Sequence, residues 1–274
     1  RLLYTKSRHA GVTSICIALS EQRLQFVSHY PTLLMAHDQD ASEEIFRKRQ
    51  VMFDNWPAEK LHLRSTPEYD SMDRVQFAHG SRCSVRTAGV RGKRAKTRGW
   101  HFKLYHFSEY AHYETYSDVK ACMAIAPASA WVIKESTANG RSGPFWQEWQ
   151  QSLTIEEAER AYAERDFATL ARWGVPHHQY KIFFSWLDDP GLAAPVFEWE
   201  TGQYNDLDEY ERTLKGLFPE RFTAQKIKWR RSKIATDCQG QDLEPKAYFS
   251  QEFPATPDEA FQSSGSTVFS QEVL

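Results

Sequence analysis

The fold is decided by residues 2–14, LLYTKSRHAGVTS, at the start of the chain. Their first three residues form a short apolar run that predicts a buried strand, and apolar residues at helical spacing over residues 13–26 predict a helix. A loop between a first strand and a first helix commonly binds phosphate groups, because the N–H groups at a helix N-terminus attract anions. The same residues also fit an ordinary connecting loop with an exposed Lys6 and Arg8.

Compared with the phosphate-loop pattern G-x-x-x-x-G-K-[ST], this loop is a variant. Gly11 and Thr13 keep their places, whereas Val12 stands at the lysine position and the cation, Lys6, has moved to the start of the loop. Because such a loop folds around phosphates, a lysine at its start can still point inward. Thr13 would then ligate Mg²⁺. The predicted phosphate-binding residues are Lys6, Ser7, Arg8, His9, Ala10, Gly11, Val12, Thr13 and Ser14.

The composition is that of an ordinary globular protein. The 274 residues are 41% hydrophobic and 26% charged, which excludes a disordered or collagen-like chain. No apolar run approaches the ~18 residues of a membrane helix. The net charge of −2 means that a nucleic-acid partner has to be met by a local basic patch. The four cysteines are scattered without a C-x-x-C pair, so neither a zinc site nor a disulfide framework is indicated.

Strands alternate with helices up to about residue 190, which favours the α/β class with a mostly parallel sheet flanked by helices. Asp40, with Glu43 three residues later, predicts the cap of the second helix. The segment after about residue 200 is helical and more charged, so we expect a core over residues 1–200 and a small helical subdomain over residues 201–274. Further strands are predicted at residues 31–37, 75–78, 83–85, 102–107, 131–134 and 180–186, and further helices at 40–53, 207–217 and 223–234.

The predicted strand 102–107 ends in Ser108 and Glu109. An apolar strand that ends in an acidic pair is the Walker B arrangement, in which one acid serves the metal and the next activates water. Here Ser108 occupies the first position, so Glu109 is the candidate general base that orients the attacking water. The alternative is that Glu109 caps the helix that follows.

Basic residues gather in two places. Seven lie between residues 82 and 98 with no acid among them, and they either contact phosphate or form a solvated loop. Five more lie on the predicted helix 223–234, as a DNA-facing edge or as an ordinary charged helix face. The first group is Arg82, Arg86, Arg91, Lys93, Arg94, Lys96 and Arg98, and the second is Lys226, Lys228, Arg230, Arg231 and Lys233.

Taken together and in order, these motifs resemble the large terminase subunit of tailed phages, the motor that packages DNA into capsids. The resemblance covers nearly the whole chain and corresponds to the ATPase region of that family. The matching stretches are KSRHAGVTS (6–14), LMAHDQDASEEIF (34–46), TRGW (97–100), LYHFSEYA (104–111), ESTANG (135–140), QKIKWRR (225–231) and QEFPATPDEAFQSSG (251–265).

The resemblance implies a P-loop NTPase of the ASCE type that uses ATP and Mg²⁺, and it implies residue roles. Lys6 and Arg8 hold the phosphates, Thr13 ligates Mg²⁺, and Glu109 is the catalytic carboxylate. Arg98 falls where related terminases carry an arginine finger for a neighbouring subunit, which can contribute ~10³–10⁵ in rate. The residues that couple hydrolysis to movement are Ser136, Thr137 and Asn139.

The resemblance also implies partners and a place of action. These are double-stranded DNA, the portal protein, the small terminase subunit and further copies of the chain in a ring on the portal, with no membrane involved. The expected location is the host cytoplasm, transiently on the procapsid portal.

Several positions depart from the family pattern. His9 replaces the usual glutamine of the loop. The sequence starts five residues before Lys6 and ends at Leu274, so we expect neither the upstream adenine-contacting segment nor the nuclease domain, and no metal-dependent DNA cleavage. The missing Walker lysine and aspartate support an alternative, a non-catalytic module that docks on DNA or the portal. A helicase-like ATPase acting on cellular nucleic acid is a third possibility.

Overall fold

The computed structural model describes residues 1–8, 10–89, 101–173, 178–240 and 244–262. The chain divides into two compact units, each assembled from several segments. The first unit comprises Arg1–Tyr4, Gly11–Ser136 and Gly143–Ile182, and the second comprises Thr5–Ala10, Thr137–Ser142 and the segment from Phe183 onward. The boundary expected at residue 200 stays a prediction.

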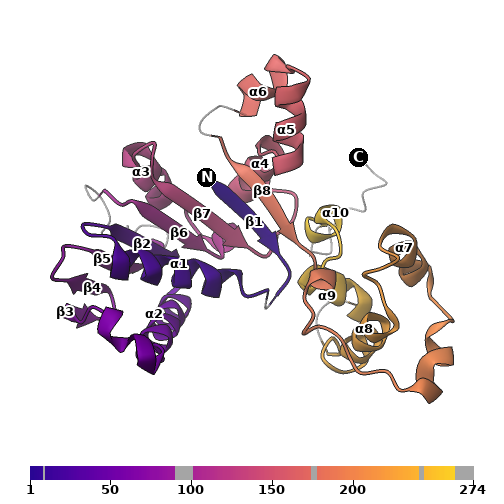
Figure 1. The fold of residues 1–274 in the computed structure, drawn as a ribbon. Coiled ribbons are helices and arrows are strands. Elements are labelled where there is room, and N and C mark those ends of the chain that lie inside the picture. The colour runs from indigo at the N-terminus through magenta and orange to yellow at the C-terminus, as the bar shows by residue number, and fades with distance from the viewer. Residues whose placement is uncertain (9, 90–100, 174–177, 241–243, 263–274) are drawn as a thin grey trace. The chain divides into compact units, whose positions relative to one another are not determined.

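Within the described residues, eight strands form one sheet in the order β3-β4-β5-β2-β6-β7-β1-β8 (Figure 1). The strand β2 is parallel to β5 and β6, and β6 is parallel to β7, whereas β3, β4 and β5 form antiparallel pairs. The strands are β1 (Leu2–Lys6), β2 (Pro31–Ala36), β3 (Pro67–Ser71), β4 (Arg74–Phe77), β5 (Arg82–Thr87), β6 (Leu104–Ser108), β7 (Trp131–Ser136) and β8 (Tyr180–Phe184).

This strand order defines the fold class. The strand β7 lies between β1, which leads into the phosphate loop, and β6, which leads into the acidic pair. One strand inserted between the phosphate-loop strand and the acidic strand is the arrangement of ASCE P-loop NTPases. The predicted mostly parallel α/β sheet is therefore confirmed.

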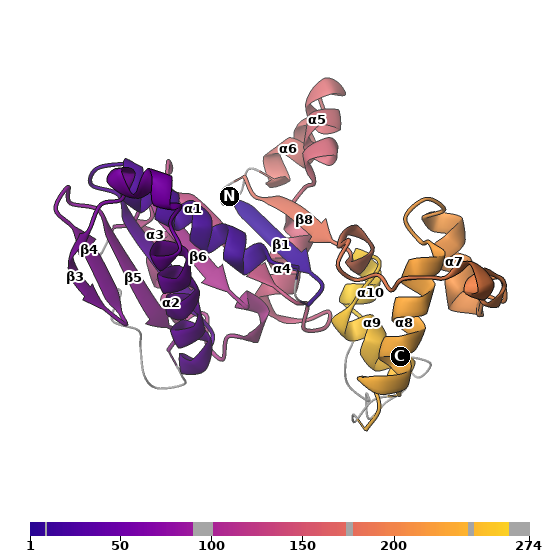
Figure 2. The same ribbon diagram turned by 60° about the horizontal axis from the view of Figure 1, so that its bottom comes forward.

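Helices cover the sheet of the first unit. The two helices α1 and α2 pack against each other and against the sheet (Figure 2), where Ile17, Leu24, Leu34 and Phe46 share one buried core. The helices are α1 (Val12–Phe26), α2 (Gln39–Asp54), α3 (Ser117–Ile125), α4 (Gly143–Gln151), α5 (Ile155–Ala163) and α6 (Phe167–Trp173), with the 3-10 turns η1 (Ala58–Leu63) and η2 (Tyr110–His112).

Two local expectations need correction. The cap of α2 is Asp38 rather than Asp40, because the Oδ1 atom of Asp38 accepts a hydrogen bond from the backbone N–H of Ala41 at 2.7 Å. The sequence patterns also do not predict the strand β3 or the helices α3, α4, α5 and α6. For α5 the sequence does carry a start signal, since Thr154 and Glu157 form a capping box with each other's backbone N–H groups.

The second unit is helical and encloses its own core. Large buried side chains meet around Trp186, including Phe222, Ile227 and Phe249. Its elements are η3 (Trp186–Asp188), η4 (Glu198–Tyr204), α7 (Glu209–Leu217), α8 (Ala224–Thr236), α9 (Pro245–Glu252) and α10 (Pro257–Ala260). None of the helices in the described segments has both the length and the apolar character that crossing a bilayer requires.

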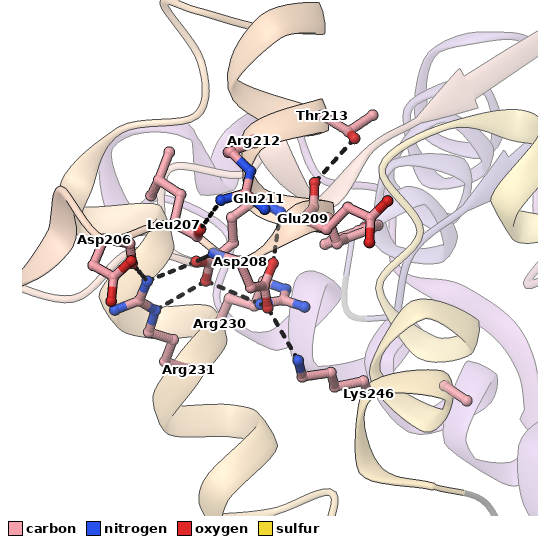
Figure 3. Close-up of polar contacts among 12 residues, drawn as sticks. Asp206, Leu207, Asp208, Glu209, Glu211, Arg212, Thr213, Arg230, Arg231 and Lys246 are labelled. Carbon is pink, nitrogen blue, oxygen red and sulfur yellow. Dashed lines mark hydrogen bonds and ion pairs between the residues drawn. The ribbon is translucent and has the colours of Figure 1, made fainter.

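The basic residues of α8 are used inside the second unit. Arg230 and Arg231 both bind the buried carboxylate of Glu211 on α7, at 3.0 and 2.6 Å (Figure 3). Lys228 pairs with Glu200 at 2.7 Å, and Lys226 is buried with its ammonium on backbone carbonyls. These pairings favour an internal role for this face of α8 over the alternative of a DNA-facing edge.

Candidate functional site

The phosphate loop continues into α1 within the first unit. Gly11 has φ of 72° and forms the N-cap of α1, a left-handed conformation that an alanine would adopt only under strain. Within the described residues no side chain caps this helix, and its first turn holds no acid. The N–H groups at the start of this 15-residue helix make its N-terminus electropositive, which suits an anion.

The first half of the loop belongs to the second unit. Lys6 and Ser7 are buried, and the backbone N–H of Ser7 donates to the carbonyl of Phe184 at 3.1 Å. The backbone N–H of Arg8 donates to the carbonyl of Glu252 at 3.0 Å, and the guanidinium of Arg8 pairs with the Glu252 carboxylate. This segment is thus held by β8 and α9, while Ala10 is half-buried and His9 lies outside the described residues.

Glu135 connects the phosphate loop with the acidic strand end. The hydroxyl of Thr13 donates to its Oε1 atom at 2.8 Å, and the hydroxyl of Ser108 donates to the same atom at 2.6 Å. Ser108 and Glu135 face each other across the parallel pair β6–β7. Three motifs that lie far apart in sequence therefore meet at one edge of the sheet, the carboxyl ends of β6 and β7, which is where α/β sheets bind ligands.

A buried histidine balances the charge of this carboxylate. His106 and Glu135 are both fully buried, with the Nε2 atom of His106 at 3.3 Å from the carboxylate. Burial disfavours the imidazolium, but Cys16 and Glu135 outweigh it and raise the pKa of His106 to about 10. The contact between His106 and Glu135 therefore helps to compensate the buried carboxylate.

Glu109 follows β6 in a strained conformation. Its φ is 52°, which is uncommon for a residue other than glycine, and such strain clusters at functional sites. Its carboxylate accepts a hydrogen bond from the hydroxyl of Ser136 at 3.3 Å and lies 4.0 Å from the Nε2 atom of His112. The side chain is 26% exposed, so solvent reaches it. Glu109 occupies the N-cap position of η2, but among the described residues its side chain makes no capping hydrogen bond to that turn.

The predicted coupling residues divide between the units. Ser136 ends β7 in the first unit, where its hydroxyl accepts from the backbone N–H of Ala111 at 3.2 Å and donates to Glu109. Thr137 and Asn139 belong to the second unit, the first half-buried and the second exposed. Ser136 is thus the predicted coupling residue that the structure joins directly to the candidate base.

The predicted basic loop lies largely outside the described residues, and Arg98 lies there too. Of its described members, Arg86 pairs with the carboxylate of Asp73 at 2.9 Å, while Arg82 lies at the start of β5. The arginine-finger role of Arg98 stays a prediction.

The residues at the strand ends suit a magnesium ion bound together with phosphates. Mg²⁺ prefers oxygen ligands and uses one or two protein groups plus substrate phosphates. The hydroxyl of Thr13 supplies such an oxygen, and the carboxylate of Glu135 lies next to it at 2.8 Å. Among the described residues, no group of three His, Cys, Asp or Glu side chains forms a cage for a metal by itself.

The strand order is that of the expected P-loop NTPase fold of the ASCE type. No protein-family model matches the chain, and a search of curated protein sequences finds no match. Among solved structures, the chain is similar to the large terminase ATPase domain of Thermus phage P74-26, with 13% identity and a TM-score of 0.46 over 82% of this chain and 86% of that one.

Two longer structures are also similar. The large terminase of a thermophilic bacteriophage, solved in complex with ADP, has 13% identity and a TM-score of 0.47, with 82% of this chain and 47% of that chain covered. The bacteriophage HK97 large terminase has 14% identity and a TM-score of 0.49, with 86% and 43% covered. The chain thus spans less than half the length of these two proteins.

Proposed function

We propose that this chain is an ATPase that drives double-stranded viral DNA into a procapsid, the motor part of a large terminase. The observation that carries the proposal is the meeting of three motifs at one sheet edge. The phosphate-loop Thr13 bonds Glu135 at 2.8 Å, and the candidate base Glu109 accepts from Ser136, the next residue along β7. Motifs that occur in the sequence in the family's order therefore lie close together in the folded chain.

The chemistry assigned to the residues is in-line attack of water on the terminal phosphate of ATP. Glu109 orients the water and accepts its proton, as a carboxylate with solvent access can do. The open N-terminus of α1 and Lys6 stabilise the phosphate charge. Bound Mg²⁺ would neutralise charge on the phosphate oxygens, with Thr13 as its protein ligand. Arg98 would complete the site of a neighbouring copy.

Partners and location follow from the same proposal. The motor would act as a ring on the portal, with double-stranded DNA and the small terminase subunit as further partners, in the host cytoplasm. Ser136 links the strand end to Glu109, so a change at the terminal phosphate can reach the segment that begins at Thr137.

Steady-state ATP hydrolysis tests the proposal. Replacement of Glu109 by glutamine should lower turnover about 10²–10⁴-fold while ATP still binds, because the substitution removes a base and keeps the shape. Glu114→Gln, an exposed acid five residues away, is the control and should retain full turnover. Full turnover in Glu109→Gln would remove Glu109 from the mechanism, and no ATP affinity in the wild-type chain would favour the docking module instead.

A further inference from the structure

The acidic strand end lacks one carboxylate that the chemistry needs. P-loop NTPases hold Mg²⁺ with the loop Ser or Thr and with an aspartate at the first Walker B position. This chain has Ser108 at that position, and a serine brings no negative charge. A second carboxylate must therefore come from elsewhere, or the metal is held without one.

The neighbouring strand places a carboxylate at this point. Ser108 and Glu135 are register partners, and adjacent strands lie about 4.8 Å apart. Because serine is short and glutamate is one methylene longer than aspartate, the Glu135 side chain can extend over Ser108. It meets the Ser108 hydroxyl at 2.6 Å and the Thr13 hydroxyl at 2.8 Å, both on Oε1.

The surroundings also fit a carboxylate that stays charged. Glu135 is fully buried, and a buried carboxylate is costly unless it is paired and hydrogen-bonded. His106 at 3.3 Å and the two hydroxyls provide this compensation. The Glu135 carboxylate is thus held against the hydroxyl of Thr13, which is the protein hydroxyl assigned to the metal.

We propose that Glu135 replaces the missing Walker B aspartate, acting as a positioning residue that orients the Thr13 hydroxyl toward the Mg²⁺ of the bound nucleotide. The inference rests on the proposed ATPase function. The competing explanation is that Glu135 only ties β6, β7 and α1 together. The two differ in one property, since a purely structural acid does not change how strongly Mg²⁺ raises nucleotide affinity.

The test measures binding rather than turnover. The affinity of the full chain for a fluorescent ADP analogue is measured with Mg²⁺ and with EDTA, and the ratio of the two affinities reports the metal contribution. Glu135→Gln should lower this ratio about 10- to 100-fold, the usual effect of losing an outer-shell partner. The affinity in EDTA should stay unchanged.

The decisive variant moves the carboxylate from position 135 on β7 to position 108 on β6. The double variant Ser108→Asp with Glu135→Gln restores an acid at the usual Walker B position and should recover most of the ratio. Glu114→Gln is the control, because it removes an exposed acid and keeps Glu135, Ser108 and Glu109, and it should keep the ratio. If Glu135→Gln does not fold in a thermal melt, Glu135→Asp preserves the charge but shortens the reach, and it should also lower the ratio.

The outcomes separate the two proposals. A wild-type ratio in folded Glu135→Gln, or in folded Glu135→Asp if the glutamine variant is unfolded, overturns the role of Glu135 and leaves the ATPase proposal standing. The role of Glu135 is also overturned if Glu135→Gln lowers the affinity ratio and the added Ser108→Asp does not restore it. A wild-type chain that binds no nucleotide under either condition overturns the proposed function, and this inference with it.

Discussion

Removing the charge of Glu211 should destabilise the second unit strongly. Glu211 is fully buried and compensates Arg230, which is only 2% exposed, at 3.0 Å, and Arg231 at 2.6 Å (Figure 3). Glu211→Gln keeps the shape and an acceptor for the capping bond from the backbone N–H of Asp208. It leaves the guanidinium of Arg230 buried without its main counter-charge.

The magnitude follows from this geometry. Breaking a buried pair typically costs about 3–5 kcal/mol. Asp208 remains 3.5 Å from Arg230 but is 32% exposed and also pairs with Lys246, so it compensates only in part. We therefore expect about 3 kcal/mol, at the lower end of that range, which corresponds to a fall of about 6–12 °C in the unfolding temperature.

Thermal denaturation followed by circular dichroism measures this change. Glu209→Gln removes an exposed acid from the same helix and should stay within about 0.5 kcal/mol of the wild type. A loss below about 1 kcal/mol in Glu211→Gln, a typical value for an ordinary substitution, would refute the assignment of the α8 basic residues to an internal role.

Further predictions concern the subunit interface, the loop and pH. Mixing Arg98→Ala with Glu109→Gln chains should restore part of the ATPase activity if the arginine acts in trans, and no recovery at any ratio counts against it. Gly11→Ala should cost about 1–2 kcal/mol in a thermal melt because its φ is 72°, whereas Gly216→Ala, which meets open space in α7, should not destabilise. Burial favours the neutral form of the Asp208 carboxyl group. Hydrogen bonds from the backbone N–H of Glu211 and from the ammonium of Lys246 outweigh this effect and hold the pKa of Asp208 below its usual value of 3.8. The ionised carboxylate of Asp208 therefore stabilises the fold above pH 3.8, and this contribution is lost as the pH falls. The difference in unfolding temperature between the wild type and Asp208→Asn should vanish in strong acid. A difference that stays constant with pH contradicts this prediction.

Elements with a strong local signal can be predicted from the sequence. The apolar run before Lys6 and the helical spacing after Gly11 depend on neighbouring residues, so the predicted β1 and α1 agree with the structure within a residue or two. The strand β3 escapes prediction because its sequence PEYDS is polar and largely exposed, and only its pairing with β4 makes it a strand. The predicted cap of α2 is wrong by two residues because Asp38 and Asp40 are chemically equivalent in sequence.

The site is predictable only where a motif marks it. Loop and strand-end patterns indicate Thr13 and Glu109. They do not indicate Glu135, because its contacts join residues 122 and 27 positions apart and arise only once β6 and β7 pair. The sequence does hold a signal in the ESTANG stretch, where Glu135 precedes the coupling residues. The α8 lysines and arginines are ambiguous in sequence for the same reason, since their partner acids come from distant elements.

The central claim is that Thr13 and Glu109, which both lie in the first compact unit, serve one nucleotide. A crystal structure of the chain with Mg²⁺ and a non-hydrolysable ATP analogue tests it most directly. The account predicts that Thr13 ligates the metal and that the Glu109 carboxylate faces the terminal phosphate. A nucleotide bound elsewhere, or a structure in which Thr13 and Glu109 are too far apart to share one triphosphate, would contradict the account.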